Sequence, residues 1–380
     1  MSGFNNIHEL EEYYYGNEFI EKVDAPVLTT TTGVFNTIFG KFLWSIFNQE
    51  ANLFGLLPKE PWEKSGWRLQ TAQAGTTADG GIAEGGTIPD TIKGTFLEVT
   101  NTLKTVAHTF EVSEHQEYLV DKDDATSDLE VMRELMAQKH KQAMNQELIT
   151  DVSADAAAAT ANYAGRDGFE TIDRVISTDS EEDAFGGTYT SFFDIFGLDR
   201  DTGTTHDAIV DHNSGTDRNL SDELIRTSIY DAKEAGAQTT VIVTGYDTLR
   251  TAIALYSDQV RYNVINEATV SVGVNGIQTE DGINTGIRIS TLYGIPMIAT
   301  VDMIQDTISR MFFLDTSDPE GSGEARLLLS IAKPTQYFQA GVDDNTPFII
   351  DKFTTKGLFR TMGEIKSTRI DVQAKLRDLS

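Results

Sequence analysis

Polar residues in one loop of this chain have a spacing that could bind a cation. In the stretch DHNSGTD, Asp211, Asn213 and Asp217 supply side-chain oxygens in a rhythm similar to that of a calcium loop. The glycine of this stretch, however, is misplaced against the EF-hand pattern. We therefore interpret the stretch as an Asx-rich turn before a helix. Asp211, Asn213 and Asp217 are kept as the metal candidates of the sequence.

Histidines are the second residue type with chemical potential. The chain has six, namely His8, His108, His115, His140, His206 and His212. His206 and His212 form the one local pair, and they lie in a polar stretch. A histidine in such a context is more often a surface residue than a metal ligand or a catalytic base, so no site is assigned to the pair.

No catalytic motif stands out. The patterns H-E-x-x-H, G-x-x-x-x-G-K-[ST] and G-x-S-x-G are absent. The stretch GVNG at 273–276 lacks the spacing of a dinucleotide-binding loop and is typical of a turn. Carboxylate pairs must arise by chance in a chain with 59 acidic residues, so they do not indicate a glycosidase. We expect no catalytic residues and no bound cofactor.

The elements around these residues suggest an assembly protein. Residues 84–114 read EGGTIPDTIKGTFLEVTNTLKTVAHTFEVSE, a Thr-rich extended segment with few large apolar groups. A two-stranded arm of this kind is marginally stable alone, and its open edges favour pairing with another chain. Ser127 and Glu130 then form a capping box that predicts a long helix over 127–152.

Residues 34–57 have apolar groups at helical spacing, among them Phe35, Phe39 and Phe42. Our preferred interpretation is a helix that docks on a neighbouring subunit or on the body of the fold. A core helix of a separate N-terminal domain is the first alternative. A membrane-surface helix is the second, although its polar face has a single lysine, where such helices are usually basic.

The rest of the chain has mixed α and β character. Residues 153–220 read as loops and short strands. We predict helices at 221–235 and 246–257, a buried strand at 241–244, and extended segments at 268–275, 286–292, 297–301 and 310–314. From Arg326 onward the pattern favours strands. This order predicts an α+β fold in which helices flank a sheet.

Composition limits the partners of this chain. Lys and Arg number 30 against 59 Asp and Glu, which gives a formal net charge of −29 distributed along the sequence. Such a surface binds nucleic acid poorly, because phosphate contacts need cations. We interpret the acid excess as adaptation to high salt, with an ordinary acidic protein as the alternative. The chain has no cysteine, no signal-peptide pattern and no apolar run long enough for a membrane span.

Several stretches together resemble a known family, the major capsid proteins of tailed double-stranded DNA viruses with the HK97-type fold. Residues 84–114 look like the returning E-loop of these proteins, and 127–152 like their spine helix. The resemblance extends over residues 66–380 and includes FETIDRVIS, VIVTGYDTL, NTGIRISTLYGIPMI, KPTQYFQAG and KGLFRTMGEIKSTRIDVQ. The stretches LKTVAHTFEVSE and LYGIPMI are the most specific parts.

The resemblance implies a domain division. We expect an N-terminal arm at 1–65, an extended β-hairpin E-loop at 66–114, and a peripheral domain at 115–235. An axial domain follows at 236–325, and 326–380 return as peripheral strands. The residues that we expect at subunit contacts are Phe35, Phe39, Phe42, Ile88, Pro89, Lys93, Glu98, Lys104 and Asn284. In some relatives an E-loop lysine forms an isopeptide cross-link, but Glu98 stands at the matching position. We expect no such bond here.

The expected function is to close a shell of hexamers and pentamers around packaged DNA, without sequence-specific DNA contacts and without a membrane. A separate scaffolding protein is expected, because about 65 residues precede the E-loop; a portal and decoration proteins are the other partners. Structural cations at subunit interfaces are a hypothesis, as is a haloarchaeal or other halophilic host. The alternatives are an encapsulin-like compartment shell and, in a different class, a salt-adapted α/β hydrolase.

Overall fold

The computed structural model describes the following residues: 27–28, 52–74, 82–87, 93–116, 128–150, 168–185, 193–200, 206–257, 290–303, 309–319, 321, 323–340 and 353–379. The chain divides into two units. The first comprises Met1–Gln49, Val106–Met144 and Lys333–Thr361, and the second comprises Glu50–Thr105, Asn145–Ala332 and Met362–Ser380. Each unit is described by itself.

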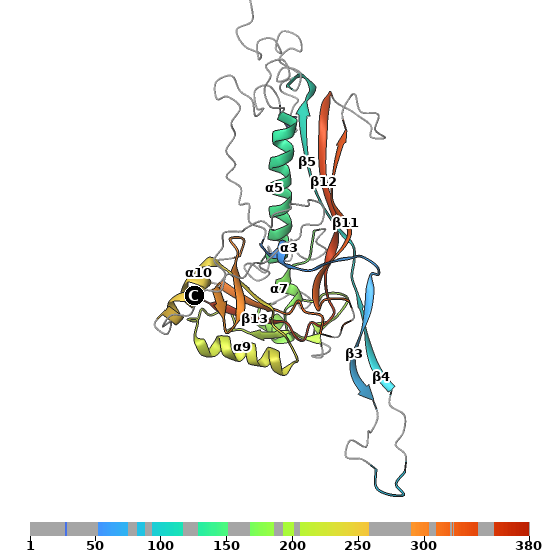
Figure 1. The fold of residues 1–380 in the computed structure, drawn as a ribbon, viewed down its shortest axis with the longest axis vertical. Helices are drawn as coiled ribbons and strands as arrows, with labels where there is room; N and C mark the ends of the chain where they lie inside the picture. The colour runs from blue at the N-terminus through green and yellow to red at the C-terminus, as the bar shows by residue number, and fades with distance from the viewer. Residues whose placement is uncertain are drawn as a thin grey trace, which may run out of the picture. The chain divides into compact units, whose positions relative to one another are not determined.

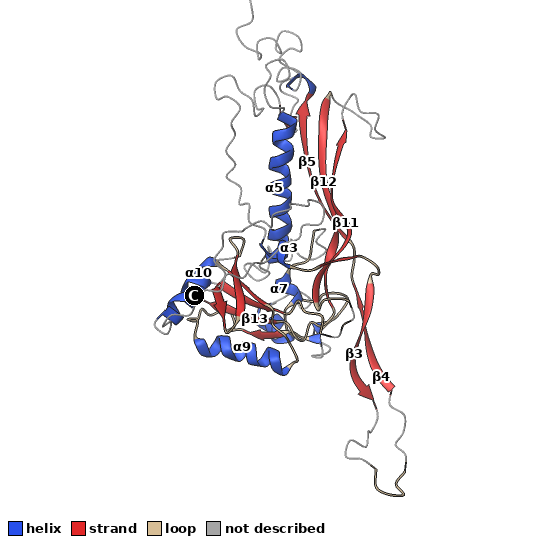
Figure 2. Cartoon of the chain, viewed as in Figure 1, coloured by secondary structure: helices blue, strands red, loops and turns tan. Residues whose placement is uncertain are grey.

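The first unit combines a long helix with long strands. Its helix is α5 (Asp128–Ile149), and its strands belong to a five-stranded sheet of order β1-β5-β12-β11-β2. In Figures 1 and 2, β5, β12 and β11 run beside one another and alongside α5. The bounds of these strands are Val27–Leu28 for β1, Lys104–Ser113 for β5, Thr354–Ser367 for β12, Leu327–Ala340 for β11 and Lys59–Pro61 for β2.

Apolar side chains from helix and sheet form the core of the first unit. Phe110 and Val112 of β5 and Phe359 of β12 are buried there, and α5 contributes partly buried apolar groups. The latter are Leu129, Met132 and Met136, three members of the apolar face predicted for 127–152. The helix predicted at 127–152 is therefore confirmed, although the observed helix ends three residues earlier, at Ile149. Ser127, the predicted cap, lies outside the described residues.

The second unit is built on a six-stranded mixed sheet of order β6-β13-β10-β7-β9-β8. Its strands are β6 (Ile209–Asp211), β7 (Val241–Thr244), β8 (Ser290–Leu292), β9 (Ile295–Ala299), β10 (Ser309–Leu314) and β13 (Ala374–Leu379). β13 pairs antiparallel with β10 and parallel with β6, and its six residues are all buried.

Two helices pack on this sheet, and local signals determine their bounds. Helix α9 (Asp222–Glu234) begins at Ser221, whose Oγ accepts a hydrogen bond from the Leu224 amide, and ends before Gly236, which has φ +92°. Helix α10 (Tyr246–Ser257) follows β7 directly. Both helices and β7 confirm the sequence-based prediction. Ile225 and Ile229 of α9 and Ala252 of α10 are buried in one apolar cluster with the sheet.

Other segments differ from expectation. Residues 169–185 were expected to be loops and short strands, but they form two short helices, α7 (Ile172–Val175) and α8 (Asp179–Phe185). The hydroxyl of Thr171 caps α7 and also bonds to the carbonyl of Thr150 at 2.7 Å, a contact that local sequence does not indicate. Of the helix predicted at 34–57, the structure describes α3 (Asn52–Leu56). The strand predicted at 268–275 lies outside the described residues.

The extended segment that we predicted within 84–114 contains two strands. β4 (Lys93–Thr100) pairs antiparallel with β3 (Gly66–Ala74), whereas β5 belongs to the five-stranded sheet. The break lies at Asn101, which is buried and donates from Nδ2 to the carbonyl of Ile365 at 2.8 Å. This bond joins positions far apart in sequence and ends the ladder. β3 and β4 together form a two-stranded arm (Figure 1).

Candidate subunit-contact surfaces

One face of the β3–β4 arm is open to solvent. Arg68 and Glu98 lie opposite each other and form an ion pair of 2.7 Å, with side chains 70% and 69% exposed. Phe96, two residues before Glu98 on the same face, is 57% exposed. More than half of this aromatic side chain is therefore exposed in the single chain. The face combines an exposed aromatic ring with a charged pair, residue types that occur together in contact surfaces.

The root of the arm is anchored by its other face. Trp67 meets Phe196 edge to face, with ring centroids 5.4 Å apart, and the ammonium of Lys366 lies 5.4 Å from the Trp67 centroid. The amide of Thr100 donates to the carbonyl of Phe196 at 2.8 Å. Aromatic packing and backbone hydrogen bonds thus hold one end of the arm on the second unit, to which the arm belongs.

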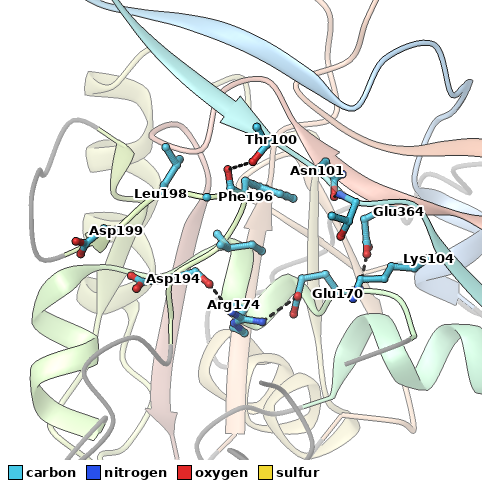
Figure 3. A pocket seen from close by; sticks show the side chains of 13 residues that line it. Thr100, Asn101, Lys104, Glu170, Arg174, Asp194, Phe196, Leu198, Asp199 and Glu364 are labelled. Carbon is cyan, nitrogen blue, oxygen red and sulfur yellow. Dashed lines mark hydrogen bonds and ion pairs between the residues drawn. The ribbon is translucent and has the colours of Figure 1, made fainter. Parts of the chain in front are cut away.

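Beside this root the second unit has a cavity of about 400 Å³. Its walls come from the end of β4 and the start of β5, from α7, from the 194–199 loop and from β12. Figure 3 shows Arg174 between Asp194 and Glu170. Its guanidinium pairs with the Glu170 carboxylate at 2.9 Å and also donates to the carbonyl of Asp194. The ionisable residues of the cavity wall are four acids, Glu170, Asp194, Asp199 and Glu364, and two bases, Lys104 and Arg174.

Glu364 is the unusual group of this cavity. Its side chain is buried, and Oε1 accepts hydrogen bonds from the amides of Glu170 and Ile365, each at 2.8 Å. Burial raises the pKa of Glu364 to about 8, against the pull of these two amides, and the nearby charge of Glu170 adds to the rise. Lys104 acts in the opposite direction. Glu364 is accordingly protonated at neutral pH and can donate a hydrogen bond as well as accept.

Deeper in the second unit lies a network of buried charges. Lys375 of β13 is 2.9 Å from Asp173 and 2.7 Å from Glu181, all fully buried. Arg310 lies 3.4 Å from Asp173, and Arg377 pairs with Glu181. Burial alone would raise the pKa of Asp173, but Arg310 and Lys375 outweigh it and hold that pKa below its usual range. We interpret these buried ions as structural rather than catalytic, because they neutralise one another inside the protein.

The structure describes some of the residues that we predicted at subunit contacts, but not all of them. Phe35, Phe39, Phe42, Ile88, Pro89 and Asn284 lie outside the described residues. Lys93 begins β4 opposite Ala74, and Glu98 is on the exposed arm face. Lys104 lines the cavity beside Glu364. The structure thus brings Glu98 together with Phe96, a residue that sequence reasoning had not selected.

The DHNSGTD loop is a turn organised around the carboxylate of Asp378. Oδ2 of Asp378 accepts hydrogen bonds from the amides of Asn213 and Gly215, at 2.7 and 3.1 Å. Ser214 and Gly215 have positive φ, as a tight turn requires, and Asp211 pairs with Arg218 at 2.8 Å. Within the described residues, no three acidic or histidine side chains gather as metal ligands would.

His206 and His212, the local pair in the sequence, each contact a different residue in the structure. His206 bonds to the carbonyl of Asp199 at 3.2 Å, while His212 contacts Ser180 at 3.3 Å. Among the histidines that the structure describes, His108 and His140 are in direct contact, and they lie in two different elements of the first unit. Their separation of 32 positions leaves no local signal that could have predicted the contact.

Solved structures of similar fold define the class of this protein. The chain is similar to the capsid asymmetric unit of Cyanophage A-1(L), with TM-score 0.55, 16% identity, and coverage of 89% of this chain and 95% of the other. It is also similar to the capsid of a native GTA particle, with TM-score 0.51, 10% identity and coverage of 97% and 99%. A third likeness is to the holo-SrpI encapsulin complex from Synechococcus elongatus PCC 7942, with TM-score 0.50, 12% identity and coverage of 87% and 88%. The fold is therefore of the HK97 type.

A family model described as SU10 major capsid protein matches residues 28–318. The chain belongs to this family. No curated protein matches it. The chain is thus a major capsid protein of a tailed phage, and it forms the head shell of the virion; its role is structural rather than enzymatic. Among the described helices, none is long and apolar enough to cross a membrane.

Proposed function

We propose that the chain assembles into hexamers and pentamers of an icosahedral shell, and that the β3–β4 arm reaches a neighbouring copy. The observation that carries this proposal is the exposed arm face of Arg68, Phe96 and Glu98, combined with a root fixed by Trp67 and Phe196. A rigid root with an uncovered apolar ring is what a docking arm needs. Glu98 cannot replace a cross-linking lysine, so the arm holds by packing and hydrogen bonds.

Replacing Phe96 with Ser tests the arm. We expect the variant to fold but to lose shells, as measured by sedimentation and negative-stain microscopy. Tyr230→Ser is the matched control, because Tyr230 is an equally exposed aromatic on α9, 56% against 57%. Shells of normal yield from Phe96→Ser would contradict the proposal, and so would an equal loss from both variants.

The domain division remains part of this proposal. The axial domain at 236–325 includes β7, β9 and β10, which share a sheet with β13 of the C-terminal segment. The arm at 1–65, the E-loop at 66–114 and the peripheral segments at 115–235 and 326–380 complete the division. Phe35, Phe39, Phe42, Ile88, Pro89, Lys93, Lys104 and Asn284 stay proposed contact residues. Separate scaffolding, portal and decoration proteins are the proposed partners, and assembly takes place in the host cytoplasm.

The charge of −29 per subunit supports a dependence of assembly on salt or on divalent cations that bridge carboxylates. It also supports a halophilic host and a wall that encloses DNA without binding its sequence. Dialysis of shells into low salt with chelator, followed by electron microscopy, tests this: intact shells would contradict it. Chelator at high salt separates the two causes, because disassembly there requires bridging cations.

A compartment shell is the second candidate, supported by the likeness to an encapsulin. That likeness concerns the fold alone. Mass spectrometry and nucleic-acid analysis of natively purified particles distinguish the two: packaged double-stranded DNA supports the virion head, while a protein cargo supports the compartment.

A further inference from the structure

His108 of β5 and His140 of α5 are in direct contact. Their Nδ1 atoms are 2.8 Å apart, and the two rings meet edge to face with centroids 5.1 Å apart. His140 is 1% exposed, whereas His108 is half-buried. Two ring nitrogens at this distance must share a hydrogen, so one Nδ1 is the donor and the other is the acceptor.

The contact continues into the sheet. Nε2 of His140 lies 2.8 Å from Oγ1 of Thr361 on β12, and this hydroxyl lies 2.8 Å from Oγ1 of Thr335 on β11. Four polar side chains therefore form one hydrogen-bonded chain that joins helix α5 to three strands. All four belong to the first unit. We refer to His108, His140, Thr361 and Thr335 as the histidine–threonine chain.

The proton capacity of this chain is limited. A neutral imidazole has one donor and one acceptor nitrogen, while a protonated imidazole has two donors. One added proton can reside on His108, which then donates to the neutral His140. A second proton sets two N–H groups and two positive charges against each other at the Nδ1 contact. The hydrogen bond between His108 of β5 and His140 of α5 is lost when both rings are protonated.

The surroundings make protonation harder still. Burial lowers the pKa of both rings, that of His140 to about 4, and the positive charge of Lys139 lowers that of His108 further. The ring of Phe359 stacks on His140 with centroids 6.2 Å apart. Other charged groups on these elements include Arg133 above the Tyr337 ring, Glu111 paired with Lys356, Arg360 above the Phe338 ring, and Lys333. Helix α5 also carries Asp128, Glu130, Glu134, Lys141 and Glu147, β5 carries Lys104, and β12 carries Glu364 and Lys366.

We propose that the histidine–threonine chain is an acid-sensitive latch that holds α5 on the sheet of the first unit and opens when both histidines are protonated. In the neutral form it satisfies the polar groups that lie between helix and strands. In acid it places repelling charges in a partly apolar contact. The latch lies within a single chain, so it does not depend on the subunit contacts proposed above.

The sign of the pH dependence follows from the lowered pKa values. The unfolded chain binds these protons near pH 6.5, and the folded chain binds them later. Stability is therefore complete above pH 6.5 and falls as pH decreases toward about 4. Each histidine reduces the folding equilibrium constant by about tenfold per pH unit within its window.

The experiment compares the full-length wild type with His108→Asn. Asparagine keeps a hydrogen-bonding group near the position of Nδ1 but does not titrate. Urea unfolding is measured between pH 7.5 and 4.5 at constant salt. We expect the folding equilibrium constant of the variant to depend less steeply on pH than that of the wild type, by about tenfold per pH unit. The comparison variant is His115→Asn, which removes an exposed histidine outside the histidine–threonine chain, and the difference between the two variants measures the effect specific to the latch.

Wild-type measurements keep the inference testable if the variant folds poorly. NMR titration of the histidine ring protons should show the His140 resonance with a midpoint well below 6.5, and hydrogen exchange in α5 should rise selectively in acid. An unchanged pH dependence in His108→Asn would overturn the latch. A normal midpoint for His140, or exchange that rises equally in α9, would overturn it as well.

Discussion

Lys375 and Asp173 form an ion pair of 2.9 Å in which neither side chain is exposed to solvent. The pair joins the last strand, β13, to the short helix α7 across 202 positions of sequence. Asp173 also faces Arg310, and Lys375 also faces Glu181. Each of these charges depends on its neighbours, because an isolated charge in such a place is strongly disfavoured.

Asp173→Asn should therefore destabilise the protein strongly. The change leaves Arg310 and Lys375 buried with one counter-charge fewer, which costs about 3–5 kcal/mol in the free energy of unfolding. Urea unfolding measures it. The control is Glu98→Gln, which breaks an exposed ion pair and should cost no more than about 1 kcal/mol. Equal effects from the two variants would contradict the role given to the buried network.

Glu364→Gln should stabilise the protein at alkaline pH. With a folded pKa of about 8 and an ordinary value of 4.5, the folded state holds one more proton than the unfolded state between these values. Stability consequently falls as pH rises through this window, by roughly 3–5 kcal/mol. Glutamine resembles the protonated acid and avoids this loss. Thermal unfolding should show equal stability at pH 5 and a more stable variant at pH 9.

Glu98→Gln again provides the comparison, because it removes an exposed carboxylate of the arm. It should show no alkaline gain. If Glu364→Gln were destabilised at every pH, Glu364 would be needed as an anion, and the protonated state inferred from its burial would be wrong.

Gly357→Ala should destabilise the first unit. A Cβ at this position of β12 would lie 2.3 Å from Cζ and 2.4 Å from Cε1 of Phe110. Phe110 is buried in the apolar cluster, so its ring cannot move aside freely. We expect a loss of about 1–3 kcal/mol in denaturant unfolding. In a Phe110→Leu background the same change should cost less, and equal costs in both backgrounds would exclude the clash.

Asn101→Ala should weaken the root of the arm. Nδ2 of Asn101 donates to the buried carbonyl of Ile365, and alanine would leave this carbonyl without its partner. The expected cost is about 1–3 kcal/mol. Thr102→Ala, at an exposed neighbour, serves as the control and should be nearly neutral. Hydrogen exchange of β4 provides a local measurement, and unaltered protection in Asn101→Ala would contradict the anchoring role.

Elements with local signals were predictable from the sequence. Helix α9 has a serine cap and a terminal glycine, and α10 and β7 have clear apolar periodicity, so their bounds agree with the structure. The break at Asn101 was not predictable, since it depends on a hydrogen bond to Ile365, 264 positions away. Helix α7 was not predicted for a related reason, because its capping residue, Thr171, also forms hydrogen bonds with the end of α5.

The candidate contact surfaces were harder to predict from the sequence than the fold. Lys104 and Glu98 were selected through the family resemblance, but the cavity needs Glu170, Arg174 and Glu364 from separate elements. The same holds for His108 and His140, whose contact requires α5 to lie on the sheet. Contacts between residues far apart in the sequence can be identified only in the folded chain, because the sequence around one residue contains no pattern that indicates the other.

The six-stranded sheet has a short outer strand at one edge. β6 contains three residues, Ile209–Asp211, and the residues directly before and after it are not in a strand. A shell protein is synthesised in many copies that crowd together before they are in place, and long open strand edges would let them aggregate. An edge this short offers few backbone donors and acceptors. Newly folded copies can thus remain separate through this part of the fold until more selective surfaces meet.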